Sequence, residues 1–129
     1  MADIVKLIQK QPDLHTLQGA TEADIRAAET MLQLQFAADY RQYVSAFGVA
    51  SFGGHELTGV CKSKRLSVVS VTQEERACNP VSDDWYVVEQ ANIDGIVIWQ
   101  DASGSVYQTG PGAKQKILCK SLAEYIDMK

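Results

Sequence analysis

The sequence predicts an α+β domain in which N-terminal helices pack on a largely antiparallel sheet of about six short strands and a C-terminal helix closes the chain. Three observations predict this class. Apolar residues recur at helical spacing as far as residue 48, short β-rich segments with tight connections follow, and helical spacing returns at the end. Tight connections join antiparallel strands, because a parallel crossover needs about a dozen residues or more. At 129 residues we expect one domain over residues 1–129 with one core.

Two helices are predicted first. Apolar side chains within residues 4–8 fall on one side of a short helix, which Pro12 terminates. Thr21, with Asp24 three residues later, has the spacing of a capping box. It predicts the start of a helix over about residues 22–33, along which apolar side chains recur at helical spacing.

A third helix has the clearest pattern. Four apolar residues lie at positions i, i+3, i+4 and i+7, namely Tyr40, Tyr43, Val44 and Phe47. Gly48 is expected to end this helix, since glycine is favoured just after a helix C-terminus. The glycine-rich residues 48–55 lack the strand before and the helix after that a phosphate-binding loop requires, so we predict a turn there.

Strand-like spacing begins after this turn. A strand pair is predicted near residues 56–61 and 66–71, where apolar and β-branched residues are bounded by polar ones. Residues 73–84 are predicted to form a loop that contains at most one helical turn.

Four further strands and a closing helix complete the chain. The strands are expected at residues 86–88, 93–100, 105–109 and 115–119. Residues 101–104 and 110–112 contain the glycines of tight turns between them. Ser121 is expected to cap the last helix, whose apolar residues share one face.

Composition and charge exclude several classes of function. Hydrophobic residues make up 46% of the chain and charged residues 22%, which is typical of a folded globular protein. A formal charge of −4 argues against nucleic-acid binding over the whole surface, because such binding requires clustered Lys and Arg. No stretch approaches the roughly 20 apolar residues that cross a bilayer, and the first residues lack a signal-peptide pattern. We therefore expect a cytoplasmic protein that binds neither nucleic acid nor membrane.

The cysteines and histidines form no recognisable catalytic or metal-binding motif. Cys61, Cys78 and Cys119 are expected to be free thiols that pack in the fold, because they are odd in number and include no CxxC pair. His15 and His55 stand at no metal-ligand spacing, so neither a metal nor a cofactor is expected. One enzymatic alternative stays open, in which Cys61 or Cys78 meets His55 in space.

Negative charge is concentrated in residues 73–101. This segment has seven acidic residues and one basic residue, a net charge of −6, whereas the rest of the chain has a net charge of +2. For Trp85 two interpretations stay open, an exposed anchor for a partner or a ring that faces the core. Trp99 is expected to be a sheet residue packed under a helix. The residues predicted to bind a basic protein partner are Glu74, Glu75, Asp83, Asp84, Trp85 and Asp94.

A combined pattern covers most of the chain. It consists of Ala-Glu at residues 28–29, an acidic and a basic residue on either side of Tyr40, a helix that runs into a glycine-rich turn, and Glu-Leu-Thr-Gly at residues 56–59. This pattern resembles the SUKH superfamily, which includes bacterial immunity proteins and the yeast cell-wall assembly regulator. Two positions depart from it, since Phe36-Ala37 stands in place of a Leu-Pro step and Ser105 in place of an acid.

The resemblance implies a small cytoplasmic protein without enzymatic activity. In bacteria such a protein typically neutralises a toxin encoded beside it, often a nuclease or deaminase of a polymorphic or contact-dependent system. Carboxylates would then occupy the site where a basic toxin holds phosphates. The alternative is a regulatory or scaffolding module without a toxin partner, as the eukaryotic branch suggests.

Overall fold

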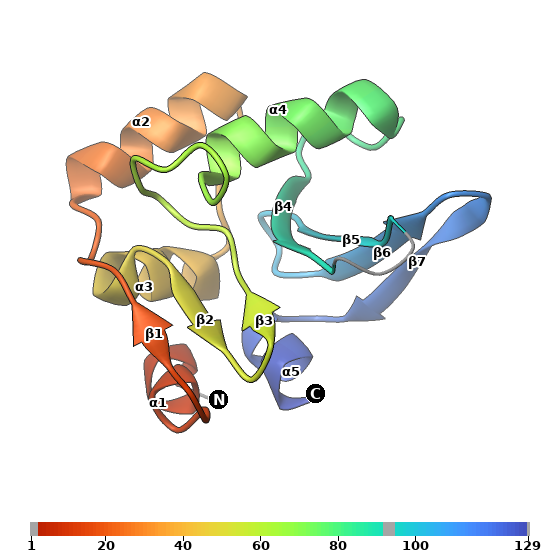
Figure 1. Ribbon diagram of the computed structural model, residues 1–129. Coiled ribbons are helices and arrows are strands. Elements are labelled where there is room, and N and C mark those ends of the chain that lie inside the picture. Colours follow the sequence, from red (N-terminus) through yellow and green to blue (C-terminus); the bar gives the residue numbers. More distant parts are fainter. Residues whose placement is uncertain (1–2, 92–94, 129) are drawn as a thin grey trace.

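The computed structural model describes residues 3–91 and 95–128. Asp94, one of the predicted partner-binding residues, lies outside them. The described elements form a small and a larger antiparallel sheet, and helices lie on both sides of the larger one (Figure 1). The predicted α+β class is therefore confirmed.

Three helices form the N-terminal part, as predicted. Their bounds are Ile4–Gln9 (α1), Glu22–Leu32 (α2) and Ala38–Phe47 (α3). The Asp3 carboxylate accepts hydrogen bonds from two backbone N–H groups at the start of α1. The capping box of α2 is complete, because the side chains of Thr21 and Asp24 each accept a hydrogen bond from the other's backbone N–H. Gly48, with a φ of 69°, ends α3.

The glycine-rich turn belongs to the small sheet. Its strands follow the order β1-β2-β3, with the bounds His15–Thr16 (β1), Ala50–Phe52 (β2) and His55–Glu56 (β3). Gly53 and Gly54 join β2 to β3 with φ angles of 51° and 84°, a region that residues with a Cβ rarely adopt. The turn predicted over residues 48–55 is thus confirmed at residues 53–54, whereas residues 50–52 form a strand. Strands β1 and β2 were not predicted, because segments of two or three residues show no periodicity.

The segment before the larger sheet departs most from the prediction. Val68–Cys78 form a helix (α4), where the sequence predicts a strand at residues 66–71 and a loop at residues 73–84. The prediction is wrong because it relied on the local preference of β-branched residues for strands. In the fold, packing of these residues on the core stabilises a helix instead. The buried residues of α4 share one helix face and are Val68, Val69, Val71 and Thr72.

The strand predicted at residues 56–61 is wrong beyond Glu56. There the chain makes only two isolated bridges, from Leu57 to Glu89 and from Gly59 to Ser67. The first of these bridges connects the end of the small sheet to an edge of the larger sheet.

The larger sheet contains four strands at about the positions expected in the second half of the chain. They lie in the antiparallel order β4-β5-β6-β7, with the bounds Tyr86–Gln90 (β4), Val97–Gln100 (β5), Val106–Gly110 (β6) and Ala113–Cys119 (β7). The strand predicted at residues 93–100 begins at Val97, and residues 93 and 94 lie outside the described ones. The turn at residues 101–104 is confirmed, and Gly104 N–H donates to the carbonyl of Asp101 at 3.0 Å. The described residues thus form seven short strands in two sheets, whereas the sequence predicts a single sheet of about six strands.

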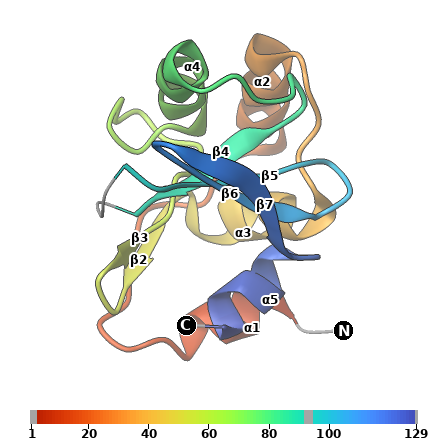
Figure 2. The same ribbon diagram turned by 90° about the vertical axis from the view of Figure 1, so that its right-hand side faces the viewer.

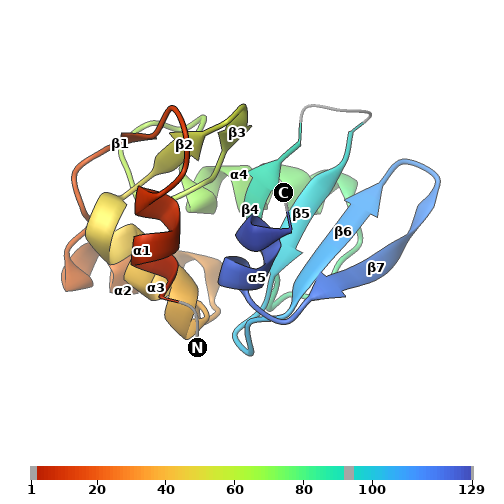
Figure 3. The ribbon, with the colours of Figure 1, turned by 90° about the horizontal axis from the view of Figure 1, so that it is seen from below.

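Helices cover both faces of the larger sheet. Figure 2 shows α2 and α4 above it and α1 and α5 below it. Helix α5, Leu122–Asp127, begins at Ser121, whose hydroxyl accepts a hydrogen bond from Glu124 N–H as predicted for the cap. Seen from below, α5 lies over β4 and β5, and α1 lies beside it over α3 (Figure 3). None of the described helices has the length and the apolarity to cross a membrane.

The sheet divides the buried apolar side chains into two clusters, where one core was expected. The larger cluster joins one face of the sheet to residues from each of the helices α1 to α5, including Val68 and Val69 at the start of α4. Trp99 is fully buried in the smaller one, so its predicted place under a helix is confirmed. The residues of the smaller cluster come from α4, from β5, and from the start of β4 with the residue before it, and are Val71, Trp85, Val87, Val97 and Trp99.

Candidate interaction surface

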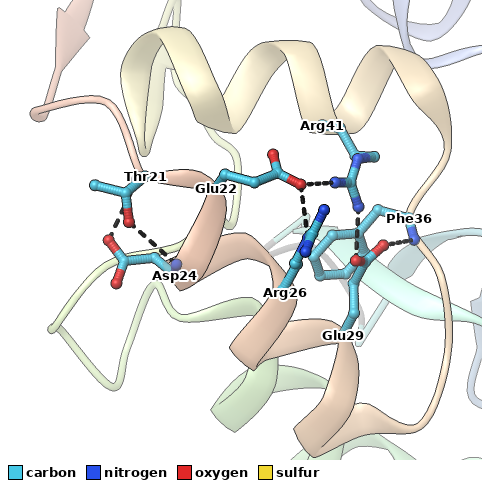
Figure 4. A network of polar contacts seen from close by, with 7 residues as sticks. All are labelled: Thr21, Glu22, Asp24, Arg26, Glu29, Phe36 and Arg41. Carbon is cyan, nitrogen blue, oxygen red and sulfur yellow. Dashed lines mark hydrogen bonds and ion pairs between the residues drawn. The ribbon is translucent and has the colours of Figure 1, made fainter.

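The residues that carry the SUKH-like pattern join the elements of the fold to one another. Glu29 on α2 accepts hydrogen bonds from Arg41 Nη1 on α3 at 2.6 Å and from the backbone N–H of Phe36 at 2.8 Å. Arg41 also donates to Glu22 Oε1 at 2.7 Å, and Arg26 donates to the same oxygen at 3.1 Å (Figure 4). The glutamate of the Ala-Glu pair and the basic residue after Tyr40 therefore fix α2 against α3.

The acidic residue before Tyr40 has a similar role. Asp39 Oδ2 on α3 accepts hydrogen bonds from the backbone N–H groups of Leu122 at 2.7 Å and Ala123 at 3.3 Å, at the start of α5. Its Oδ1 accepts a bond from Gln100 Nε2 at 3.2 Å. A side chain on α3 thus caps α5 and connects both helices to the sheet.

Two buried tyrosines of α3 hold the Glu-Leu-Thr-Gly segment. The Tyr40 hydroxyl lies 2.8 Å from Thr58 Oγ1, and the Tyr43 hydroxyl donates to the Thr58 carbonyl at 2.7 Å. Burial raises the pKa of both phenols above its ordinary value, so they stay neutral. The pattern residues therefore make contacts within the molecule, between one element of the fold and another.

The three cysteines lie in different environments. All are free, as predicted. Cys119 is buried, and half-buried Cys61 donates its thiol hydrogen to the Ser63 carbonyl at 3.6 Å. Cys78 is exposed at the end of α4, so the expectation that all three pack in the fold is wrong for it.

Glu89 and His55 pair across the two sheets. Glu89 is 3% exposed, its Oε2 lies 3.0 Å from His55 Nδ1, and its Oε1 accepts a hydrogen bond from the Tyr125 hydroxyl at 2.6 Å. One carboxylate of the acidic segment is thereby used for joining β3, β4 and α5. Within residues 3–91 and 95–128, no group of three or more His, Cys, Asp or Glu side chains could hold a metal ion.

The two predicted glutamates lie on α4 and differ in their surroundings. Glu74 is exposed. Glu75 is half-buried, and its carboxylate accepts hydrogen bonds from Gln90 Nε2 at 2.7 Å and from Asn79 Nδ2 at 3.4 Å. Glu74 is therefore available to a partner, whereas Glu75 is held by its neighbours.

The two predicted aspartates lie in the loop between α4 and β4, and both are exposed. Arg76 on α4 fixes this loop, because its Nη2 donates to the carbonyls of Asp83 and Trp85. The Ser82 hydroxyl donates to Asp84 Oδ1. The carboxylates of Asp83 and Asp84 thus stand at the surface on a loop whose backbone is tied to a helix.

Trp85 is directed into the molecule. It is 9% exposed, and its ring stacks on that of Tyr107 with centroids 3.9 Å apart and an angle of 12° between planes. The interpretation of a ring that faces the core therefore fits the structure better than that of an exposed anchor. Trp85 instead supports Tyr107 from its inner side.

Tyr107 is under the influence of two acidic residues, Asp101 and Asp84. Its hydroxyl donates to Asp101 Oδ2 at 2.7 Å. Burial raises the pKa of the Tyr107 hydroxyl, and this hydrogen bond and the charges of Asp101 and Asp84 raise it further. Burial would raise the pKa of Asp101 as well, but hydrogen bonds from Ser103, Tyr107 and the Ser105 backbone outweigh it and lower that pKa. Asp101 thus stays ionised at neutral pH.

Ile117 on β7 extends this surface. It pairs directly with Tyr107 across the strands, and paired residues share a face of the sheet. Its side chain is 60% exposed, whereas Tyr107 is half-buried. We name the acidic-aromatic patch after its five members, Asp83, Asp84, Asp101, Tyr107 and Ile117.

Three members of the patch were not among the predicted partner-binding residues. Asp101 was within the acidic segment, so its charge was a usable signal. Tyr107 and Ile117 lie outside that segment and join it only through strand register, which places Trp99, Tyr107 and Ile117 in one row. Sequence spacing does not contain this register.

Comparison with known proteins agrees with the pattern and the fold. The family model SUKH_5, described as SMI1-KNR4 cell-wall, matches residues 1–128. No curated protein matches the chain. Because the family model spans nearly the whole chain, the protein belongs to the SUKH_5 family, SMI1-KNR4 cell-wall.

Proposed function

We propose that this protein is a cytoplasmic immunity protein that binds a basic toxin and neutralises it without catalysis. The observation that carries the proposal is the acidic-aromatic patch, in which half-buried Tyr107 donates to Asp101, the exposed side chain of Ile117 pairs with it across the strands, and the exposed loop before β4 adds Asp83 and Asp84. Charged groups around an apolar centre are the usual composition of a protein interface. Family membership is consistent with this role.

The mechanism is occlusion by charge and shape. The carboxylates attract a basic surface and occupy the place of the phosphates that a nuclease holds, while Tyr107 and Ile117 fill an apolar contact. Arg76, Ser82 and Trp85 already fix the loop, the Asp84 side chain and the Tyr107 ring. Binding therefore costs little conformational entropy at the patch. A standard interface of about 800 Å² per partner would cover about a ninth of the 7242 Å² surface.

The first experiment is copurification with the product of the adjacent gene, a nuclease or deaminase toxin in this proposal. We expect a stable complex and survival of cells that express both proteins. The variant Asp83→Lys, Asp84→Lys should lose both, whereas Asp127→Lys on α5, which is also exposed, should keep both. Absence of any complex with neighbouring gene products would contradict the proposal.

The description of the family, SMI1-KNR4 cell-wall, favours a second candidate, a regulatory or scaffolding module without a toxin partner. The same patch would then bind one or more basic regions of other cellular proteins. The two candidates differ in the number of partners. Affinity capture with wild type should return one neighbouring gene product in the first case and several unlinked proteins in the second. The Asp83→Lys, Asp84→Lys variant should lose these partners in either case.

A further inference from the structure

A groove of about 360 Å³ lies between α2 and the segment that leads into α4. Figures 1 and 2 show α2 and α4 side by side on the same side of the larger sheet. Much of the lining is apolar, from Ala27, Ala28 and Met31 on α2 to Val60 and Val69 opposite. Met31 is 64% exposed, the largest exposure among the large apolar side chains described. Exposed apolar side chains beside an apolar groove are typical of a surface that binds a partner.

The rim of the groove is positively charged. Lys62 and Lys64 line it, both are exposed, and neither takes part in an ion pair within the described part of the chain. The neighbouring Arg65 is neutralised by Glu56, with hydrogen bonds of 2.7 and 3.0 Å. The acid at the rim, Asp24, accepts a hydrogen bond from Thr21 N–H in the cap of α2.

We propose that this groove binds an acidic, apolar segment of a protein partner. Apolar side chains of the segment pack against Met31 and Ala28, and its carboxylates lie beside Lys62 and Lys64. A protein segment fits better than a small molecule, because small ligands are mostly enclosed by their sites. Here several lining residues are themselves open to solvent, and a partner covers them from outside.

The groove and the acidic-aromatic patch are distinct surfaces of opposite charge. They lie at the two ends of α4, whose 11 residues span about 16 Å. Each surface is therefore expected to select segments of the opposite sign, and the groove does not depend on the proposed toxin partner.

The test uses a labelled 14-residue peptide with Leu at helical spacing and Glu between, and a second peptide with Lys in place of Glu. Amide shifts of the isotope-labelled protein report where each peptide binds. We expect the Glu peptide to shift groove residues 27–31 and 60–70, with an affinity that falls as salt is added. The Lys peptide should not bind there.

Two charge-reversed variants separate the groove from other basic surface. Lys62→Glu, Lys64→Glu should weaken the Glu peptide at least tenfold, whereas Lys114→Glu, Lys116→Glu on β7 should leave its affinity unchanged. Met31→Ser should also weaken it, because the apolar wall is lost and no charge is added. Asp83→Lys should have no effect on it, so the failure of this proposal and that of the toxin proposal are distinguishable.

The proposal is overturned if the Glu peptide leaves the groove residues unshifted at millimolar concentration. It is also overturned if the Lys62→Glu, Lys64→Glu variant and the Lys114→Glu, Lys116→Glu variant weaken binding of the Glu peptide equally. It is also overturned if octanoate saturates the groove while the peptide does not bind, since the site would then take a small amphiphile.

Discussion

At the scale of single residues, Ala37 shows how a departure from the family pattern can add a hydrogen bond to the core. The pattern has proline where this chain has Ala37, and the backbone φ of Ala37 is −64°, a value that proline also adopts. Ala37 has an N–H, which proline lacks, and donates it to the buried Tyr86 hydroxyl at 2.9 Å. That hydroxyl in turn donates to Gln100 Oε1 at 2.7 Å.

Restoring the proline is expected to have two opposing effects. In wild type, Ala37→Pro restricts the unfolded chain, a gain of about 0.4–1 kcal/mol, and loses one hydrogen bond, a cost of about 0.5–1.5 kcal/mol. In a Tyr86→Phe background that bond is already absent, so we expect Ala37→Pro to raise the free energy of unfolding there. Urea denaturation of the four proteins measures the difference, and equal effects in both backgrounds would contradict the assigned bond.

A second residue-scale prediction concerns acid. The pKa of Asp101 is lower in the folded protein than its usual value of about 3.9, in part because Tyr107 donates to it. Such a group stabilises the fold above its unfolded pKa and loses that contribution as pH falls through the folded pKa. Tyr107→Phe should therefore raise the pKa of Asp101, measured by carboxyl NMR, and reduce the stability lost below about pH 4. An unchanged Asp101 titration would refute this.

At the scale of elements, helices that are short by themselves are held by residues from other elements. Helix α5 has six residues, well below the length of about 12 at which isolated helices become stable in water. Its first turn is capped both by its own Ser121 and by Asp39 of α3. The pairing of α3 with α5 is thus part of the stability of α5.

Removing this cap should loosen α5 before the rest of the fold. Asp39→Ala is expected to lower the free energy of unfolding by about 1–2 kcal/mol, because backbone N–H groups of Leu122 and Ala123 lose their acceptor. Amide hydrogen exchange should accelerate most in α5. The control Asp127→Ala, exposed at the other end of the helix, should change stability by less than about 0.5 kcal/mol, and similar losses in both variants would argue against the cap.

The elements also show what the sequence could predict. Helices α1, α2 and α3 follow from spacing and caps, since the signals of Thr21 and Gly48 are local. Helix α4 cannot be predicted in this way, because Val68, Val69 and Val71 favour a strand locally. Their burial against the core is what stabilises the helix. The predicted site was incomplete for a related reason, since cross-strand register brings Tyr107 to the acidic loop.

At the scale of the whole molecule, a net charge of −4 conceals two surfaces of opposite sign. Carboxylates gather in the acidic-aromatic patch near one end of α4, and Lys62 and Lys64 stand at the other end. The acidic segment itself is only partly available, because Glu89 is buried and Glu75 is bound by Gln90. The charge that a partner meets is therefore set by the fold rather than by composition.

The most direct test of the central claim is the affinity of the adjacent gene product for wild type and for Asp83→Lys, Asp84→Lys, measured by calorimetry at low and high salt. We expect the variant to bind at least tenfold more weakly and with a smaller dependence on salt, and Asp127→Lys to bind as wild type does. Circular dichroism should give the same fold for all three. Equal affinity and equal salt dependence of the folded variant and wild type would contradict binding through the acidic-aromatic patch.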